Sequence, residues 1–194
     1  MTTGTGARAL RSDARLNHDR VLEAAAHAFN EPGADTSMKA IARAANVGIG
    51  TLYRRFPTRG QMIDATYRNE TTKLAESADT LLATQAPTKA LRLWMDGFTD
   101  YILTKHGMAE ALPTILATTD GLRTHSRDLL REAIARLILA GSEAAELRAD
   151  IDPNDVLMAL GGITLIADNE RQRELASRLC DLLMDGLTAR HNHG

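Results

Sequence analysis

The chain has 194 residues, a net charge of −2 and one cysteine, Cys180. This length fits one domain, or a small domain joined to a medium one, and the single cysteine excludes an intrachain disulfide and a four-cysteine metal site. No apolar run approaches the roughly 18 residues of a membrane helix, and the polar start of the chain lacks the apolar segment of a signal peptide, so we expect a reduced, cytoplasmic protein without membrane contact.

The first predicted feature is an arm. Residues 1–14 are polar and Gly/Thr-rich, and we expect a flexible basic arm that carries Arg8 and Arg11. Together with Arg15 these side chains could enter a DNA minor groove, as the arms of homeodomains do; a solvated tail is the alternative. Helical spacing of apolar residues then covers residues 15–30, and a Pro-Gly pair soon after it ends the helix.

Two short helices are predicted next. The first of them is about two turns long, with Thr36 or Ser37 as its N-cap. Its apolar stripe has helical spacing: Met38, Ile41, Ala42 and Ala45. Asn46, a residue type that tolerates left-handed backbone angles, marks a turn. The second helix is expected from about Gly48 to Phe56, and the proline that follows ends it.

The rest of the chain also predicts helices. Thr58 and Gln61 have the spacing of a capping box, which indicates a long helix to about Ala83. Pro87 opens another helix, and a broken stretch follows it. Three further helices are expected over about 121–140, 153–168 and 170–189. No strand signal outweighs helix, so we expect an all-α protein of about nine helices.

The two short helices with the helix before them have the order of a helix-turn-helix domain. Leu52 and Phe56 are four residues apart and are expected to face inward, which leaves Thr51, Arg54 and Arg55 on other faces. Arginine can bond guanine or phosphate with two donors. Lys and Arg exceed Asp and Glu by nine to five in residues 1–60, and fall short by 14 to 20 in residues 61–194. Only the front of the chain is therefore expected to meet a polyanion, with chance unevenness as the alternative.

The segment from Arg20 to Ile63 resembles the DNA-binding domain of TetR-family (tetracycline-repressor-like) regulators. The runs that carry the resemblance are VLEAAAHAF and TSMKAIARAANVGIGTLYRRFPTRGQMI. The resemblance implies phosphate contacts by four residues: Ser37, Lys39, Tyr53 and Arg59. It implies that four others lie in or beside the major groove: Ile49, Gly50, Thr51 and Arg55. Arg54 would reach the DNA backbone. Asn46 and Gly60 depart from the family pattern without removing a DNA contact.

The same resemblance implies an N-terminal three-helix helix-turn-helix domain over residues 15–60 and a C-terminal helical ligand-binding and dimerisation domain over residues 61–190. We expect an apolar ligand pocket in the latter, from seven residues: Trp94, Phe98, Tyr101, Leu112, Leu116, His125 and Met158. The alternative is that the aromatic residues are simply core, and that His125, like His106, is a surface histidine. Cys180 is expected to be inert core.

The last two predicted helices are unusually apolar, and Gly161-Gly162 would let another helix approach closely. The resemblance implies that they pair with those of a second copy. The expected interface residues are Leu157, Leu160, Gly161, Thr164, Leu179 and Leu183. The alternative is that both helices only close the core of one chain.

These patterns predict a DNA-binding transcriptional regulator, in particular a repressor that a small-molecule ligand releases from its operator. Its expected partners are double-stranded DNA with a near-palindromic operator, a second copy of the chain and an unknown small-molecule effector. The long helix that starts near Thr58 would transmit the change between the domains. The sequence holds no catalytic motif and no metal-ligand pattern, and the His191 and His193 tail is expected to be a frayed end. We expect no enzyme activity, no cofactor and no metal; the alternative is a helical small-molecule-binding protein or enzyme without DNA binding.

Overall fold

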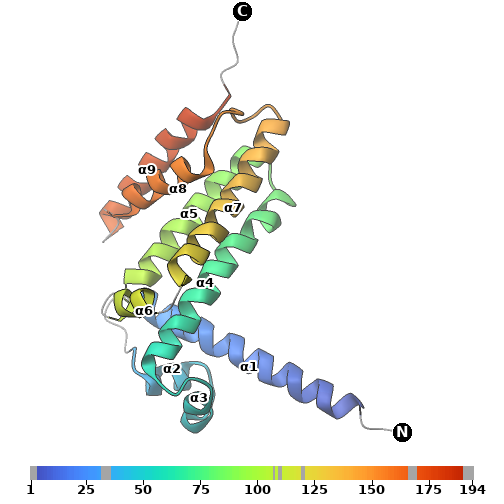
Figure 1. Ribbon diagram of the computed structural model, residues 1–194, viewed down its shortest axis with the longest axis vertical. Coiled ribbons are helices and arrows are strands. Elements are labelled where there is room, and N and C mark those ends of the chain that lie inside the picture. The colour runs from blue at the N-terminus through green and yellow to red at the C-terminus, as the bar shows by residue number, and fades with distance from the viewer. Residues whose placement is uncertain are drawn as a thin grey trace, which may run out of the picture. The chain divides into compact units, whose positions relative to one another are not determined.

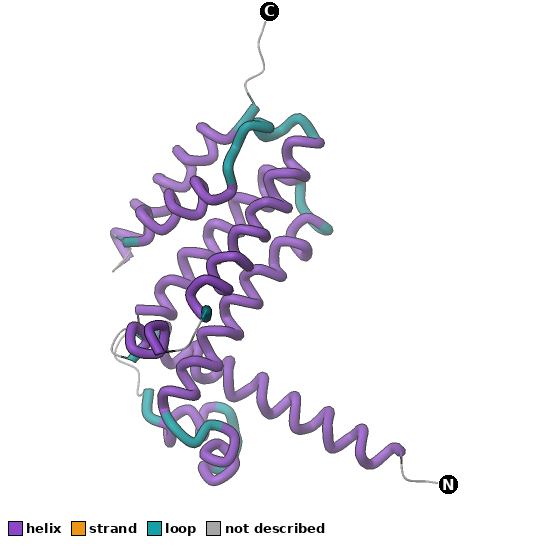
Figure 2. Tube along the Cα trace, viewed as in Figure 1, coloured by secondary structure: helices purple, strands orange, loops and turns teal. Residues whose placement is uncertain are grey.

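The computed structural model describes residues 4–31, 36–106, 108, 111–118, 121–165 and 170–189, with the side chains of 4–16, 103, 106, 118 and 170–172 left out of the description. Over these ranges the chain forms nine helices (Figure 1): α1 (Gly4–Asn30), α2 (Met38–Ala44), α3 (Ile49–Arg55), α4 (Arg59–Leu82), α5 (Pro87–His106), α6 (Leu112–Thr118), α7 (Leu122–Glu143), α8 (Pro153–Thr164) and α9 (Glu170–Leu187). Within the described ranges there is helix and loop but no strand (Figure 2). The expected all-α class is confirmed.

The chain divides into two compact units. The first contains residues 1–69 and 104–118, and the second contains residues 70–103 and 119–194. The division therefore falls inside α4, beyond residue 60, where the sequence suggested a boundary. Met62, Ile63 and Tyr67 of α4 are buried and belong to the first unit, so the first turns of this helix complete the first unit's core.

Helix α1 begins at Gly4 and not at Arg15, so residues 4–14 are helical where we expected a flexible arm. The expectation of an arm rested on the polar, Gly/Thr-rich composition of this first part of the helix. It is rich in alanine and arginine, which are good helix formers. Residues 1–3 and the side chains of Arg8, Arg11 and Arg15 lie outside the described part of the structure.

The core of the first unit follows the predicted stripes. Helix α1 contributes Val21, Leu22, Ala25 and Phe29, and α2 contributes Met38, Ile41 and Ala42. Helix α2 packs between α1 and α3. The burial of these side chains orients α2 and, through the packing of α2 on α3, also orients α3. Each of these two helices is too short to be stable in water on its own.

In the second unit, hydrogen bonds from α5 to α4 fix how these two helices pair. The indole Nε1 of Trp94 donates to the carbonyl oxygen of Leu74 at 2.8 Å, and the hydroxyl oxygens of Tyr101 and Thr71 are 3.0 Å apart. All four groups are buried, where an unpaired donor costs about 1–3 kcal/mol. These bonds therefore specify one register between α4 and α5.

The start of α8 confirms another local prediction. The Asp152 carboxylate accepts a hydrogen bond from the backbone N–H of Asn154 at 2.8 Å, with Pro153 in the first turn. Helix α8 packs against α7 and α9. No helix in the described part of the chain has the length and apolar character needed to cross a membrane, and the described residues include no cluster of His, Cys, Asp or Glu suited to hold a metal ion.

Candidate nucleic-acid interface

Helices α2 and α3 are joined by a tight turn. The Ser37 hydroxyl caps α2 by accepting a hydrogen bond from the backbone N–H of Ala40 at 3.2 Å. Asn46 then adopts a φ of +53°, the left-handed geometry that the sequence predicts for it. The backbone N–H of Val47 donates to the carbonyl of Ala42 at 3.0 Å. These local hydrogen bonds close the turn. They therefore set the direction of α3 independently of the contacts that its side chains make.

Helix α3 has one face buried against the first unit and another face exposed. Leu52 and Phe56 are buried, as their spacing predicts. The outward side chains include an apolar pair, Ile49 at 42% and Tyr53 at 48% exposure. Four other residues are exposed too: Gly50, Thr51, Arg54 and Arg55. The helix therefore presents hydroxyl, guanidinium and apolar groups together on a surface that the first unit does not use for its own packing.

Gly50 lies on the exposed face of α3 and places no side chain there. A Cβ atom at this position would meet nothing within 4 Å, so the first unit does not itself require a glycine there. The missing side chain makes the helix backbone accessible to a neighbouring molecule. A close approach of this kind is one of the reasons for a glycine at a recognition surface.

His18 of α1 supports the end of α3. Its ring stacks on Phe56, with centroids 5.6 Å apart, and it lines a cavity of about 330 Å³ together with Thr51, Arg54 and Arg55. Its Nδ1 atom is buried and has no hydrogen-bond partner among the described residues. Burial lowers the pKa of His18, the nearby charge of Arg55 lowers it further, and Asp19 opposes both effects. The arrangement therefore favours the neutral imidazole.

Sequence reasoning missed His18, although a signal was present. His18 lies three and four residues before Val21 and Leu22, so it extends the apolar stripe of α1 by one turn. A histidine on such a stripe is buried, at least in part, when the helix packs.

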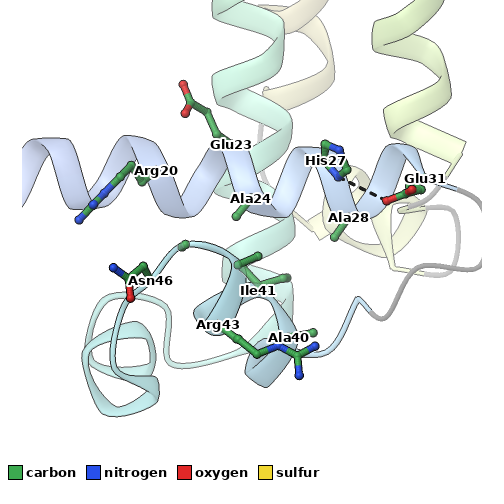
Figure 3. Close-up of a pocket in the computed structure, with 12 residues that line it drawn as sticks. Arg20, Glu23, Ala24, His27, Ala28, Glu31, Ala40, Ile41, Arg43 and Asn46 are labelled. Atoms are coloured by element: carbon green, nitrogen blue, oxygen red, sulfur yellow. Dashed lines mark ion pairs between the residues drawn. The ribbon is translucent and has the colours of Figure 1, made fainter.

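A groove of about 640 Å³ lies between α1 and α2 (Figure 3). Ala24 and Ala28 of α1 face Ala40 and Ile41 of α2 across it. Two positive residues, Arg20 and Arg43, and two negative residues, Glu23 and Glu31, line the groove together with His27. The Nδ1 atom of His27 lies 3.5 Å from the Oε2 atom of Glu31 at one edge of the groove. The groove thus has no net preference for a polyanion and is distinct from the exposed face of α3.

Arg59, a predicted phosphate contact, has partners within the first unit. Its guanidinium donates hydrogen bonds to the carbonyl oxygen of Thr36 and, at 2.9 Å, to the Thr36 hydroxyl. Its Cζ atom lies 5.6 Å from the centroid of the Phe29 ring. Beside it, the backbone N–H groups of Thr58 and Gln61 bond each other's side chains at 3.3 and 3.2 Å, which confirms the capping box. Lys39, another predicted phosphate contact, is exposed on α2.

The structure does not gather the seven predicted pocket residues into one unit. Leu112 and Leu116 belong to the first unit, and the other five belong to the second. Trp94, Phe98 and Tyr101 are buried, whereas His125 and Met158 are exposed. The side chain of His106 lies outside the described residues.

The predicted dimer residues divide in a different way. Leu157, Leu160 and Thr164 are buried within the single chain, and Gly161, Leu179 and Leu183 are partly exposed. The most exposed apolar side chains of this region are other residues: Met158, Leu165, Leu175 and Leu182. Half of the predicted set is therefore buried within the single chain and half is partly exposed, because both helices carry apolar residues on more than one side. Cys180 is buried, and burial raises the pKa of its thiol.

Comparisons with known proteins agree with this geometry. Residues 21–66 match the family model of bacterial regulatory proteins of the tetR family, and residues 86–189 match that of the C-terminal domain of SbtR-like transcriptional regulators. No curated protein matches the chain.

Solved structures match over almost the whole chain. A TetR transcriptional regulator from Streptomyces coelicolor is 44% identical, with a TM-score of 0.82 over 89% of this chain and 99% of its own. A TetR transcription regulatory protein from Mycobacterium vanbaalenii is 28% identical, with a TM-score of 0.73 over 93% and 99%. A regulatory protein TetR from Rhodobacter sphaeroides, at 19% identity and a TM-score of 0.62 over 90% and 100%, shares the fold.

Proposed function

Because the chain belongs to the TetR family of transcriptional regulators, we propose that it is a repressor that binds an operator through α3 and leaves it when a small molecule binds. The observation that carries this proposal is the division of α3 into two sides. Leu52 and Phe56 anchor the helix in the core, while Thr51, Arg54 and Arg55 are exposed. A short helix built in this way can enter a major groove without disturbing the unit that holds it.

We assign the exposed residues the roles that the TetR family pattern implies, and the chemistry of their side chains fits these roles. Ile49, Gly50, Thr51 and Arg55 lie in or beside the major groove, where arginine bonds guanine and apolar groups contact thymine methyls. Ser37, Lys39 and Tyr53 contact phosphates, and Arg54 reaches the DNA backbone. Phosphate contacts supply affinity that falls with salt, and base contacts supply selectivity.

The proposal includes a homodimer. Leu165, the C-cap residue of α8, and Leu182 of α9 are 76% and 66% exposed, and we infer that they belong to one apolar interaction surface. We therefore centre the dimer interface on the outer faces of α8 and α9, with Met158 and Leu175 beside these two residues. The two copies of α3 would then read half-sites about 34–36 Å apart, or a related distance, in a near-palindromic operator.

Release by a small molecule follows the rules of linked equilibria. A ligand bound in the second unit would favour a form of the dimer whose α3 helices have the wrong spacing for DNA. It can release DNA only to the extent that it binds that form more tightly. Helix α4 contains residues of both units, so we propose it as the element that transmits the change. The protein acts by binding and not by catalysis.

Footprinting on the DNA upstream of the protein's own gene tests the proposal. We expect protection of a near-palindromic site at low salt, and steep loss of protection between low and physiological salt. A duplex of scrambled sequence is the control. Absence of protection at low salt would instead favour a helical small-molecule-binding protein that does not bind DNA, and a flat response to salt would contradict the phosphate contacts.

A further inference from the structure

Arg59 joins three parts of the first unit that are distant in sequence. It is the first residue of α4, and its two terminal guanidinium nitrogens both donate to Thr36, one to the carbonyl oxygen and the other to the hydroxyl at 2.9 Å. The guanidinium also lies over the Phe29 ring near the end of α1, with 5.6 Å between the Cζ atom and the ring centroid. One side chain therefore connects the end of α1, the residue before the cap of α2, and the start of α4.

The backbone at Arg59 is also fixed in position. Thr58 and Gln61 form a reciprocal capping box around the start of α4, so the backbone from which Arg59 extends is held on both sides. A planar guanidinium with several donors in fixed directions suits two acceptors on one residue, and a lysine ammonium does not reproduce that geometry.

The residue held by Arg59 lies next to two proposed phosphate contacts. Thr36 directly precedes Ser37, whose hydroxyl is engaged with the backbone N–H of Ala40 at 3.2 Å, and Lys39 follows in the first turn of α2. Fixing Thr36 therefore fixes where α2 begins and where its exposed Lys39 is presented.

We propose that Arg59 is a positioning residue that sets the start of α2 against the DNA backbone, and that it is not itself a phosphate contact. This inference rests on the proposed function, because it concerns how the same surface meets the operator. Two of the five guanidinium N–H donors are directed at Thr36, and the group lies over the Phe29 ring, so contacts within the first unit set its orientation.

The salt dependence of operator binding separates the two roles. The probe is a duplex selected by the wild-type protein from a randomised pool. We expect Arg59→Ala and Arg59→Lys both to lower affinity several-fold and to reduce the slope of log affinity against log salt by up to about 1, because the displaced Lys39 loses its phosphate. If Arg59 itself contacted a phosphate, Arg59→Lys would instead bind nearly as well as the wild type, with an unchanged slope.

A substitution that changes no charge gives a matched test. Thr36→Val removes the hydroxyl acceptor and keeps the backbone carbonyl. We expect it to reproduce part of the affinity loss and part of the slope reduction of Arg59→Ala, although it removes no charge. Unchanged affinity in Thr36→Val would contradict the proposal. Because this variant makes the smaller change, it also carries the test if Arg59→Ala does not fold.

Double-mutant cycles distinguish positioning from a general loss of stability. We expect Lys39→Ala to cost less affinity in the Arg59→Ala background than in the wild type, because a displaced Lys39 has already lost its contact. Arg55→Ala on α3 should cost the same in both backgrounds. Equal costs for Lys39→Ala would overturn the proposal. Failure of the proposed function has a different outcome, in which the wild-type protein selects no sequence from the pool.

Discussion

The imidazole ring of His18 stacks on the Phe56 ring, with centroids 5.6 Å apart and planes inclined by 19°. Phe56 is the C-cap residue of α3 and is buried. Helix α1 thus supports the end of the proposed recognition helix through an aromatic contact, in addition to the aliphatic core that lies between α1 and α2.

This contact predicts a pH-dependent stability of the first unit. The pKa of His18 is lowered in the folded state, by burial first and by Arg55 second, while Asp19 raises it. The unfolded chain therefore binds the proton more tightly, so the stabilisation is fully present above the unfolded pKa of about 6.5 and is lost as the pH falls through that value towards the lower folded pKa. Arg54 also lines the cavity.

The measurement is the free energy of unfolding at about pH 7.5 and about pH 5.5. We expect the wild type to lose more stability between these values than His18→Phe, which keeps an aromatic ring against Phe56 but cannot bind a proton. His125→Gln, which removes an exposed histidine of the second unit, is the control and should behave as the wild type does. An equal acid loss in His18→Phe and the wild type would show that His18 is not responsible.

Gly50→Ala is expected to separate stability from DNA binding. The new Cβ meets nothing within 4 Å in the first unit, and alanine in place of glycine stabilises a helix by about 0.5–1 kcal/mol. If the groove approaches the α3 backbone at this point, operator affinity should fall by about tenfold, or about 1.4 kcal/mol. Thermal unfolding and gel-shift titration measure the two effects.

Gly60→Ala is the matched control. Its Cβ would meet only the Thr58 hydroxyl, at an ordinary 3.8 Å, so it should stabilise the first turn of α4 and leave operator affinity unchanged. Equal affinity in Gly50→Ala and the wild type would show that DNA does not approach the α3 backbone at residue 50.

Arg55→Ala and Tyr53→Phe should both weaken operator binding while dimerisation and helix content stay intact. An arginine bonded to a base by two donors contributes about 1–3 kcal/mol of discrimination, so Arg55→Ala should also relax the preference at one base pair per half-site. Tyr53→Phe removes only a hydroxyl and should weaken binding about equally for all sequences. Gel shifts, sedimentation and circular dichroism check these outcomes, and dissociation of the dimer in either variant would mean that the two functions are located differently.

Leu182→Ser should weaken the dimer. Leu182 is 66% exposed on α9, and burying a leucine against a partner contributes about 1.5–3 kcal/mol. Leu139 on α7 is 59% exposed, and Leu139→Ser should leave the dimer unchanged. Sedimentation equilibrium over a range of protein concentrations compares them. Dissociation by Leu139→Ser alone would place the interface on α7.

The sequence by itself determined the features that depend on neighbours a few residues apart. The Thr58–Gln61 capping box, the Asp152 cap with Pro153, and the left-handed Asn46 are all present in the structure. Each depends on bonds or backbone angles within one turn, and such local chemistry can be read from residue type and spacing alone. The burial of Leu52 and Phe56 followed in the same way, from one face of one short helix.

Only the tertiary structure decided which partners distant residues choose. The sequence offered both Thr36 and Ser37 as the cap of α2; the structure uses Ser37 and leaves Thr36 to accept hydrogen bonds from Arg59. The indole of Trp94 bonds the backbone of Leu74. Helices α8 and α9 carry leucines on several faces, so spacing could not separate the inward Leu160 from the outward Leu182. The physical reason is common to all three, because each depends on how helices far apart in the chain pack, and many packings satisfy the same local pattern.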